Sequence, residues 1–255
     1  MKFLITILAF CFLATSARSQ QQPFQTWLTY NHQARLSDKW GYTFDLNHRT
    51  LGTFPFNSFL SAARAGGVYQ LNNALRVTAG YAWFGTIING RSRPWLHENR
   101  LYQQIQQNKV RNGIQMVQRV RLEQRFRQQF KQSSSDDVNV AFTFRARYMF
   151  QVGGPLIKNA KTSRTALSWQ AANEVFFHFG ENLNGNNFDQ NRTLAGVLIN
   201  LGKVTDLAVL YQFIAQRQPL RETTVGIHSV RFTLFQNLDL RKAKKTQPID
   251  IPTLD

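Results

Sequence analysis

The chain lacks the features that define several common classes of protein. It contains one cysteine, Cys11, in 255 residues, so a disulfide framework and a paired-cysteine zinc site are both excluded. After residue 20, no apolar run approaches the ~18 residues that indicate a transmembrane helix. No glycine-rich phosphate loop and no cluster of metal ligands is recognisable. We therefore expect no metal and no cofactor.

Acidic residues are also scarce, with 14 against 31 basic residues and a formal net charge of +17. In an intracellular protein this excess would suggest nucleic acid as a partner. Here the arginines are spread along the chain, and the N-terminus indicates export. We expect no nucleic acid partner. The expected partners are outer-membrane lipids, with lipopolysaccharide phosphates or small anions as further candidates.

Residues 1–19 have the organisation of a cleaved signal peptide. A charged start, Met1-Lys2, precedes an apolar stretch from Phe3 to Leu13, and Ala17-Arg18-Ser19 supplies the small residues that signal peptidase recognises. The apolar stretch, about eleven residues, is shorter than the ~20 of an uncleaved helical anchor. We expect cleavage after Ser19, one domain over residues 20–240, and a basic then acidic tail over residues 241–255.

Apolar and polar side chains alternate along most of the remaining chain. In residues 40–49, aromatic and aliphatic side chains occupy one face, while Asp45 and Arg49 lie on the other. Alternating strands of ~10 residues with arginine on one face are typical of a lipid-spanning barrel. We expect eleven strands, at about residues 24–35, 40–50, 58–71, 74–86, 96–107, 113–130, 138–151, 165–178, 189–201, 204–216 and 223–236.

The connections between these strands alternate between tight turns and longer loops, as in bacterial barrels. Such barrels have an even number of strands, and the 152–164 gap is long for its place in the alternation. We therefore predict an all-β, antiparallel up-and-down transmembrane β-barrel of about ten to twelve strands, with one strand missed or miscounted.

Six short motifs in a fixed order make the chain similar to a known family. They are Glu98-Asn99-Arg100-Leu101-Tyr102-Gln103-Gln104, Arg121-Leu122-Glu123-Gln124-Arg125-Phe126, Phe144-Arg145-Ala146-Arg147-Tyr148, Asn173-Glu174-Val175-Phe176-Phe177, Phe188-Asp189-Gln190-Asn191-Arg192 and His228-Ser229-Val230. Over about residues 24–240 the chain resembles the family called domain of unknown function 2490. The resemblance implies an exported outer-membrane β-barrel and no established activity.

The polar faces of the strands between residues 96 and 201 carry a dense set of charges. If the aromatic faces point outward, unpaired arginine on the same side would cost several kcal/mol in hydrocarbon. The charged set should therefore face the lumen. Its members are Glu98, Arg100, Arg119, Arg121, Glu123, Arg125, Arg127, Arg145, Arg147, Glu174 and Arg192.

Charge complementarity predicts how this set pairs. We prefer a register that places Glu98 opposite Arg125 and Arg100 opposite Glu123. A two-residue hairpin turn at Asn112-Gly113 would instead place Glu98 opposite Arg127. Glu123 should be the centre of the set, near Arg100 and near Arg145 or Arg147. Glu174 should face Arg192 across the 179–188 loop.

Two roles for the charged set stay open. Carboxylate–guanidinium pairs could fill and brace a narrow barrel. Alternatively, the eight arginines and three glutamates of the set leave positive charge that would attract small anions into a pore. We expect a structural envelope protein or a narrow pore, with a narrow or occluded lumen. Replacing Arg119, Arg121 and Arg127 by glutamine should lower anion selectivity if the lumen conducts.

Other classes of protein make different demands on the same residues. A barrel-embedded lipid-modifying enzyme would need a Ser/His pair, but His228 and Ser229 are adjacent on a strand and point to opposite faces. We expect no catalytic residue. A soluble exported β-sandwich or a lipocalin-like binding protein would place the apolar faces inside. A barrel in lipid would instead expose Phe142, Phe144, Leu207, Val209 and Tyr211 and enclose Glu123 and Arg145.

Aromatic side chains at strand ends suggest a membrane-interface girdle. A sugar-binding platform at Trp95, beside Arg91 and Arg93, is the alternative for that residue. The residues assigned to the girdle are Trp27, Trp40, Tyr42, Trp83, Tyr148 and Trp169.

Overall fold

The computed structural model describes residues 24–52, 57–87, 95–130, 137–158, 165–180, 187–218 and 223–241. The expected signal peptide, the tail beyond residue 241, and Arg91 and Arg93 lie outside these ranges. Within them, no helix is long and apolar enough to cross a membrane.

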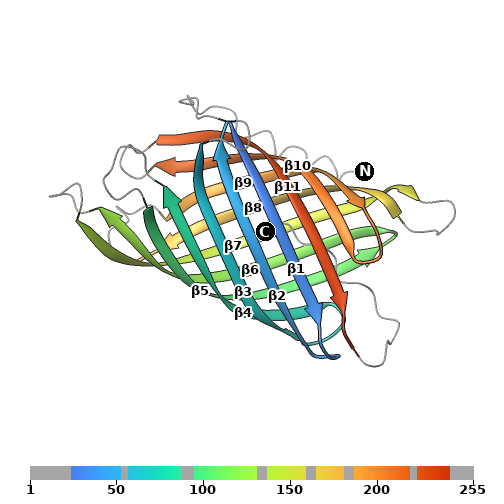
Figure 1. The fold of residues 1–255 in the computed structure, drawn as a ribbon. Coiled ribbons are helices and arrows are strands. Elements are labelled where there is room, and N and C mark those ends of the chain that lie inside the picture. The colour runs from blue at the N-terminus through green and yellow to red at the C-terminus, as the bar shows by residue number, and fades with distance from the viewer. Residues whose placement is uncertain are drawn as a thin grey trace.

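Eleven strands form one closed barrel, in which each strand is hydrogen-bonded to its sequence neighbours (Figure 1). All eleven predicted strands are confirmed, most of them within one or two residues at each end. They are β1 (Gln25–Arg35), β2 (Trp40–Leu51), β3 (Ser58–Gln70), β4 (Leu75–Ile87), β5 (Trp95–Arg111), β6 (Ile114–Phe130), β7 (Val138–Lys158), β8 (Thr165–Phe179), β9 (Phe188–Asn200), β10 (Thr205–Gln218) and β11 (Thr223–Asp239).

The barrel closes through a parallel pair between β1 and β11, in register from Gln25 opposite Ser229 to Arg35 opposite Asp239. All other neighbours are antiparallel. With an odd number of up-and-down strands, the first and last run in the same direction, so the closing pair must be parallel. The expectation of an even number is therefore wrong, and no strand was missed among the described residues.

The long 152–164 gap has a local explanation. Strand β7 continues to Lys158, and its pairing with β8 becomes irregular after Pro155. Proline cannot donate a ladder hydrogen bond, so an irregular strand end is where it is tolerated. Residues 152–158 of this gap therefore belong to β7, whereas the alternation predicts that the strand ends at residue 151.

The β5–β6 hairpin turns at Asn112 and Gly113, whose φ angles are 52° and 77°. Positive φ at both central residues is the signature of a type I′ turn. Glu98 therefore lies opposite Arg127, and Arg100 lies opposite Arg125. The register that we preferred on charge is wrong, because turn geometry determines the pairing and long arginine side chains can reach diagonal partners.

Apolar side chains face outward and charged side chains face inward. Phe142 and Tyr211 are 46% and 49% exposed, whereas Glu123 and Arg145 are 3% and 5% exposed. Phe144 is also exposed, and Leu207 and Val209 point outward but are half-buried. A β-sandwich is excluded, because one sheet closes on itself.

The interior has two chemically different walls. Inward residues of β5 to β7 are mainly charged or amide side chains. An apolar cluster on β8 to β11 contains Ala172, Leu194, Ala208, Leu210 and Phe235. The two parts of the inner wall therefore differ in polarity.

Candidate functional site: the charged lumen

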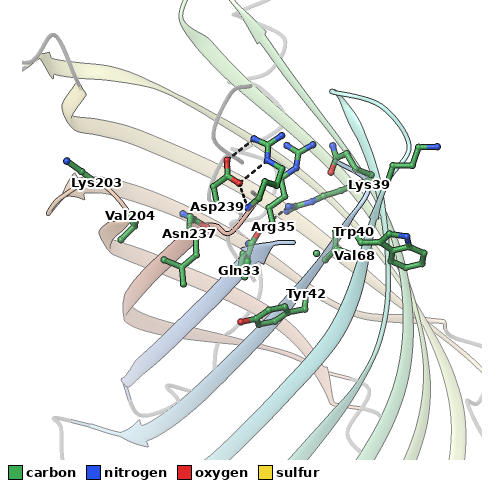
Figure 2. Close-up of a pocket in the computed structure, with 16 residues that line it drawn as sticks. Gln33, Arg35, Lys39, Trp40, Tyr42, Val68, Lys203, Val204, Asn237 and Asp239 are labelled. Carbon is green, nitrogen blue, oxygen red and sulfur yellow. Dashed lines mark hydrogen bonds and ion pairs between the residues drawn. The ribbon is translucent and has the colours of Figure 1, made fainter. Parts of the chain in front are cut away.

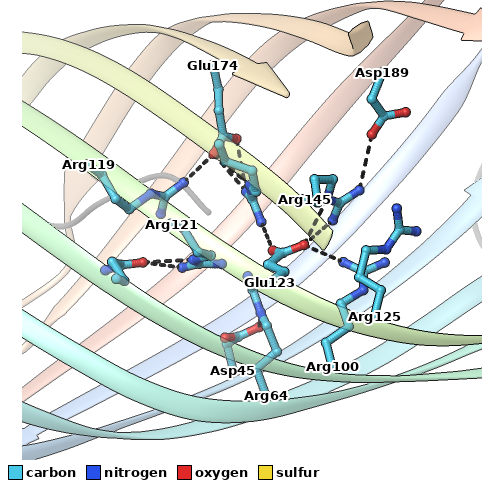
Figure 3. Close-up of polar contacts among 12 residues, drawn as sticks. Asp45, Arg64, Arg100, Arg119, Arg121, Glu123, Arg125, Arg145, Glu174 and Asp189 are labelled. Atoms are coloured by element: carbon cyan, nitrogen blue, oxygen red, sulfur yellow. Dashed lines mark hydrogen bonds and ion pairs between the residues drawn. The ribbon is translucent and has the colours of Figure 1, made fainter. Parts of the chain in front are cut away.

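Glu123 of β6 lies at the centre of the charged wall (Figure 3). Its Oε2 accepts a hydrogen bond from Arg145 Nε at 2.8 Å, and its Oε1 accepts one from Arg147 Nη1 at 2.7 Å. Arg100 Nη1 lies 3.5 Å from Oε2. One carboxylate therefore holds three guanidinium groups from two neighbouring strands, as the sequence predicted for this residue.

Two further glutamates extend the network along the barrel. Glu174 of β8 accepts hydrogen bonds from Arg119 Nη2 at 2.8 Å and from Arg147 Nε at 2.9 Å. Glu98 of β5 accepts hydrogen bonds from Arg100 Nε at 2.7 Å and from Arg125. Arg147 links Glu123 to Glu174, and Arg100 links Glu123 to Glu98, so the ion pairs form one connected layer.

The remaining members of the predicted set have different surroundings. Arg121 donates to Gln104 Oε1 at 2.9 Å, and Arg127 lies near the end of β6, at the mouth of the barrel. Arg192 is opposite Glu174 in the β8–β9 register, as predicted. Its guanidinium lies over the Phe176 ring at 4.5 Å, and its buried Nε has no acceptor.

Several inward charges lie outside the predicted set. Asp45 of β2 pairs with Arg64 of β3, with Nε 2.8 Å from Oδ1. Asp189 contacts His178 Nε2 at 2.9 Å and Arg145 Nη1 at 3.3 Å. Asp45 shares the polar face of 40–49 and could have been assigned from the alternation. Asp189 lies within an irregularity of the β8–β9 pairing, between Phe188 and Gln190, so the alternation does not give the direction of its side chain.

Positive charge dominates the described interior. Apart from the rim at the short-turn end, five carboxylates face it: Asp45, Glu98, Glu123, Glu174 and Asp189. Apart from the same rim, twelve arginines line it or lie buried within it: Arg49, Arg64, Arg76, Arg100, Arg119, Arg121, Arg125, Arg127, Arg145, Arg147, Arg192 and Arg231. The surplus is larger than the sequence set indicated.

Trp27 is the clearest correction among the aromatic residues. The sequence placed it in an outward girdle, but its side chain is 1% exposed and faces the interior. Arg49 lies over its indole ring at 3.5 Å from the centroid. Trp27 occupies an odd position of β1 together with Thr29 and Asn31, which also face inward. Parity along the strand therefore gives its orientation, whereas residue type alone does not.

Other expected girdle residues do point outward. Trp40, Tyr42 and Tyr148 are exposed, and Trp83 and Trp169 are half-buried on the outside. Trp95 is exposed at the start of β5. His228 is exposed and bonded to the Tyr211 hydroxyl, while Ser229 is fully buried, so the two residues point to opposite faces as predicted.

Four cavities lined by the described residues fall into two pairs. At the end with the longer connections, a cavity of about 350 Å³ adjoins one of about 60 Å³. At the short-turn end, a cavity of about 140 Å³ adjoins one of about 20 Å³. The cavities of each pair share lining residues, but the two pairs share none. Arg100, Arg145 and Arg147 of the connected ion-pair layer line the 60 Å³ cavity.

The short-turn end carries a second ionic cluster, on the rim of the 140 Å³ cavity (Figure 2). Arg241 donates from Nη2 to Asp239 Oδ2 at 2.7 Å and from Nη1 to Asp38 Oδ1 at 2.9 Å. The hydrogen bonds from the Arg241 side chain lower the pKa of the Asp239 carboxyl to about 2. This cluster attaches the end of β11 to the β1–β2 turn.

Among the described residues, no group of three His, Cys, Asp or Glu side chains is placed to hold a metal ion. The site is therefore defined by arginine, carboxylate and amide groups in a closed barrel. Such groups can bind anions or brace one another.

The fold and its interior define a closed, mostly antiparallel β-barrel with a cationic lumen. Residues 24–223 match a family described as protein of unknown function (DUF2490), and the chain belongs to that family. A comparison with curated proteins finds no match.

Proposed function

We propose that the protein is an integral β-barrel of the bacterial outer membrane and that its ion-pair layer closes the lumen. The observation that carries the proposal is the reversed distribution of polarity. Large apolar side chains such as Leu101, Leu122 and Phe142 are 40% or more exposed, while arginines inside are almost fully enclosed. In water such a surface would be an extensive apolar patch; in lipid it is the expected one.

The dimensions of the strands agree with this location. The shortest strand, β1, has 11 residues, and the longest, β7, has 21. A tilted strand of ~9–11 residues crosses the hydrocarbon core. A lipocalin-like soluble barrel holds its ligand inside, with polar residues outside. No such distribution is present here, so the membrane reading is favoured.

The lumen is better suited to bracing than to free permeation. Arg145 and Arg147 both donate hydrogen bonds to Glu123 in the ion-pair layer. Moving this layer aside would break bidentate guanidinium–carboxylate contacts in a low-dielectric interior, where unpaired charges are costly. The protein then acts as a structural envelope barrel with a closed centre.

Four measurements test the proposal. The protein should fractionate with outer membranes, resist extraction by urea, and migrate differently on a gel before and after heating. After purification and reconstitution in planar bilayers, its conductance should stay at background. Recovery in the soluble periplasmic fraction would contradict the membrane location, and a large conductance would contradict closure.

A narrow anion-selective pore is the second candidate, and the arginine surplus favours it. In that case conductance would be measurable and anion-selective, and Arg119→Gln, Arg121→Gln and Arg127→Gln together would lower the selectivity without unfolding the barrel. If the charges only brace the wall, the same triple variant should lose heat resistance while conductance stays at background. The two outcomes distinguish the candidates directly.

A further inference from the structure

Three arginines gather around Trp27 without a carboxylate partner. The guanidinium carbons of Arg49, Arg192 and Arg231 lie 3.5, 5.2 and 5.9 Å from a ring centroid of Trp27. Within the described residues none of the three forms an ion pair. Arg231 is 2% exposed, and its Nη2 has no acceptor. We call Trp27 and these three arginines the Trp27 cluster.

The Trp27 cluster faces open space. Arg49 and Arg192 line both the 350 Å³ cavity and the 60 Å³ cavity, at the point where the two adjoin. The Nε of Arg49 bonds to Asn47, and the Nε of Arg192 is buried without an acceptor. Their remaining guanidinium donors therefore have no acceptor among the described side chains, and the space beside them is large enough for one.

The same cavity has a second, apolar wall. Ile214 and Ile227 pack with Trp27 and Val225 in a buried cluster, and Trp27, Ile214 and Ile227 all line the 350 Å³ cavity. Arg100 and Arg145 also line the cavity, and their ion pairs with Glu123 hold them in place. Glu98 lines it too, but its carboxylate is already paired with Arg100 and Arg125. The cavity thus presents arginines, one carboxylate that is already paired, and an apolar surface.

We propose that this cavity binds a small organic anion. Its carboxylate or phosphate group would accept hydrogen bonds from Arg49 and Arg192, and its apolar part would lie against Trp27, Ile214 and Ile227. Guanidinium groups bind both kinds of head group with paired hydrogen bonds. A cavity of about 350 Å³ is within the usual size range of small-molecule sites. The inference deepens the proposed closed barrel, which it uses as a rigid container.

The electrostatics of the Trp27 cluster favour an anion beside it. Buried charges in proteins are normally paired, because an unpaired one pays a large desolvation cost. The ion-pair layer formed by Glu98, Glu123 and Glu174 with their arginines, called the Glu123 layer, satisfies that rule. The Trp27 cluster does not. An anion at the junction of the two cavities would supply the counter-charge to Arg49 and Arg192 at once.

Calorimetric titration of the full-length barrel, refolded in a non-ionic detergent, tests the site. The probes are phenyl phosphate and benzoate, with inorganic phosphate and benzyl alcohol to separate the head group from the ring. We expect phenyl phosphate or benzoate to bind at least tenfold more tightly than inorganic phosphate, and benzyl alcohol not to bind. Preference between the two aromatic anions identifies the head group.

The Arg49→Gln/Arg192→Gln double variant should weaken aromatic anion binding by at least thirtyfold. A control that also removes two positive charges is Lys109→Gln/Arg111→Gln, at exposed positions of β5. It should bind as the wild type does. Because Arg49 and Arg192 support no carboxylate, the double variant should keep its heat-dependent gel mobility, which is checked in parallel. Ile227→Ala should weaken phenyl phosphate but not inorganic phosphate.

Several results would overturn the inference: no binding of either aromatic anion, unchanged binding by the double variant, or an equal loss in the control. Equal affinity for phenyl phosphate and inorganic phosphate would overturn the organic part. These outcomes are separate from the test of the proposed function. A barrel that fails to bind anions can still be closed, and a conducting barrel can still bind them at Arg49 and Arg192.

Discussion

The Glu123 layer and the Trp27 cluster are built from the same residue type on neighbouring parts of one lumen, yet they differ in counter-charge. In the layer, Arg145 and Arg147 share Glu123, and each also contacts a second carboxylate. In the cluster, Arg49 and Arg192 contact aromatic rings instead. The difference suggests that one set of arginines stabilises the fold and the other is kept for a ligand.

Removing the central carboxylate should have the largest effect. Glu123→Gln leaves Arg145, Arg147 and Arg100 without their shared partner, and breaking a buried pair in this way costs about 3–5 kcal/mol. The free energy of unfolding in urea, measured on the refolded barrel in detergent, should fall by that amount. Asp206→Asn is the matched control, because Asp206 is bonded to Asn200 and not to an arginine. A similar loss in both variants would show that the layer has no special role.

Overpacking at Gly80, next to Tyr102, should cause the next largest loss of stability. Tyr102 lies opposite Glu123, and an added Cβ at Gly80 would clash with the Ala65 backbone carbonyl oxygen and would lie 2.6 Å from the Tyr102 hydroxyl oxygen. Gly80→Ala should therefore cost about 1–3 kcal/mol through overpacking. At Gly67 an added Cβ meets nothing within 4 Å, so Gly67→Ala should be neutral or slightly stabilising. Coincident unfolding curves of the two variants would mean that the Tyr102 side chain and the backbone at Ala65 both shift at little cost.

Removing an arginine from the Trp27 cluster should raise the free energy of unfolding rather than lower it. Arg192→Gln removes a buried cation that forms no ion pair with a carboxylate among the described residues, so the free energy of unfolding should rise, by about 1 kcal/mol. Arg147→Gln, a cation of the layer, should lower it under the same conditions. The comparison between layer and cluster fails if both variants change stability in the same direction.

Much of this arrangement could be predicted from alternation alone. The eleven strands, the inward facing of Glu123 and the outward facing of Phe142 all follow from a two-residue period and the cost of arginine in an apolar environment. These features are local, or depend on one face of one strand. They can therefore be predicted without knowing which strands close the barrel.

What could not be predicted depends on long-range geometry. The Trp27 cluster brings together Arg49 of β2, Arg192 of β9 and Arg231 of β11, which become neighbours only when β1 pairs with β11. The β5–β6 register failed for a different reason. Charge pairing and turn chemistry disagreed, and the Asn112-Gly113 turn prevailed because diagonal arginines satisfy Glu98 in either register.

The smallest expected effect concerns the ionic cluster at the short-turn rim, outside the membrane-spanning part of the proposed barrel. The Arg241 side chain lowers the Asp239 pKa to about 2, so the contact is complete above the ordinary carboxyl pKa of about 4 and is lost as the pH falls through about 2. Titration of the Asp239 carboxyl carbon by NMR should show this midpoint. Arg241→Gln should return it to about 4, and Lys203→Gln, on the same cavity, should not. Because this pair meets water, its loss should leave the urea unfolding of the barrel nearly unchanged. A large destabilisation would mean that burial is not what separates this rim cluster from the Glu123 layer.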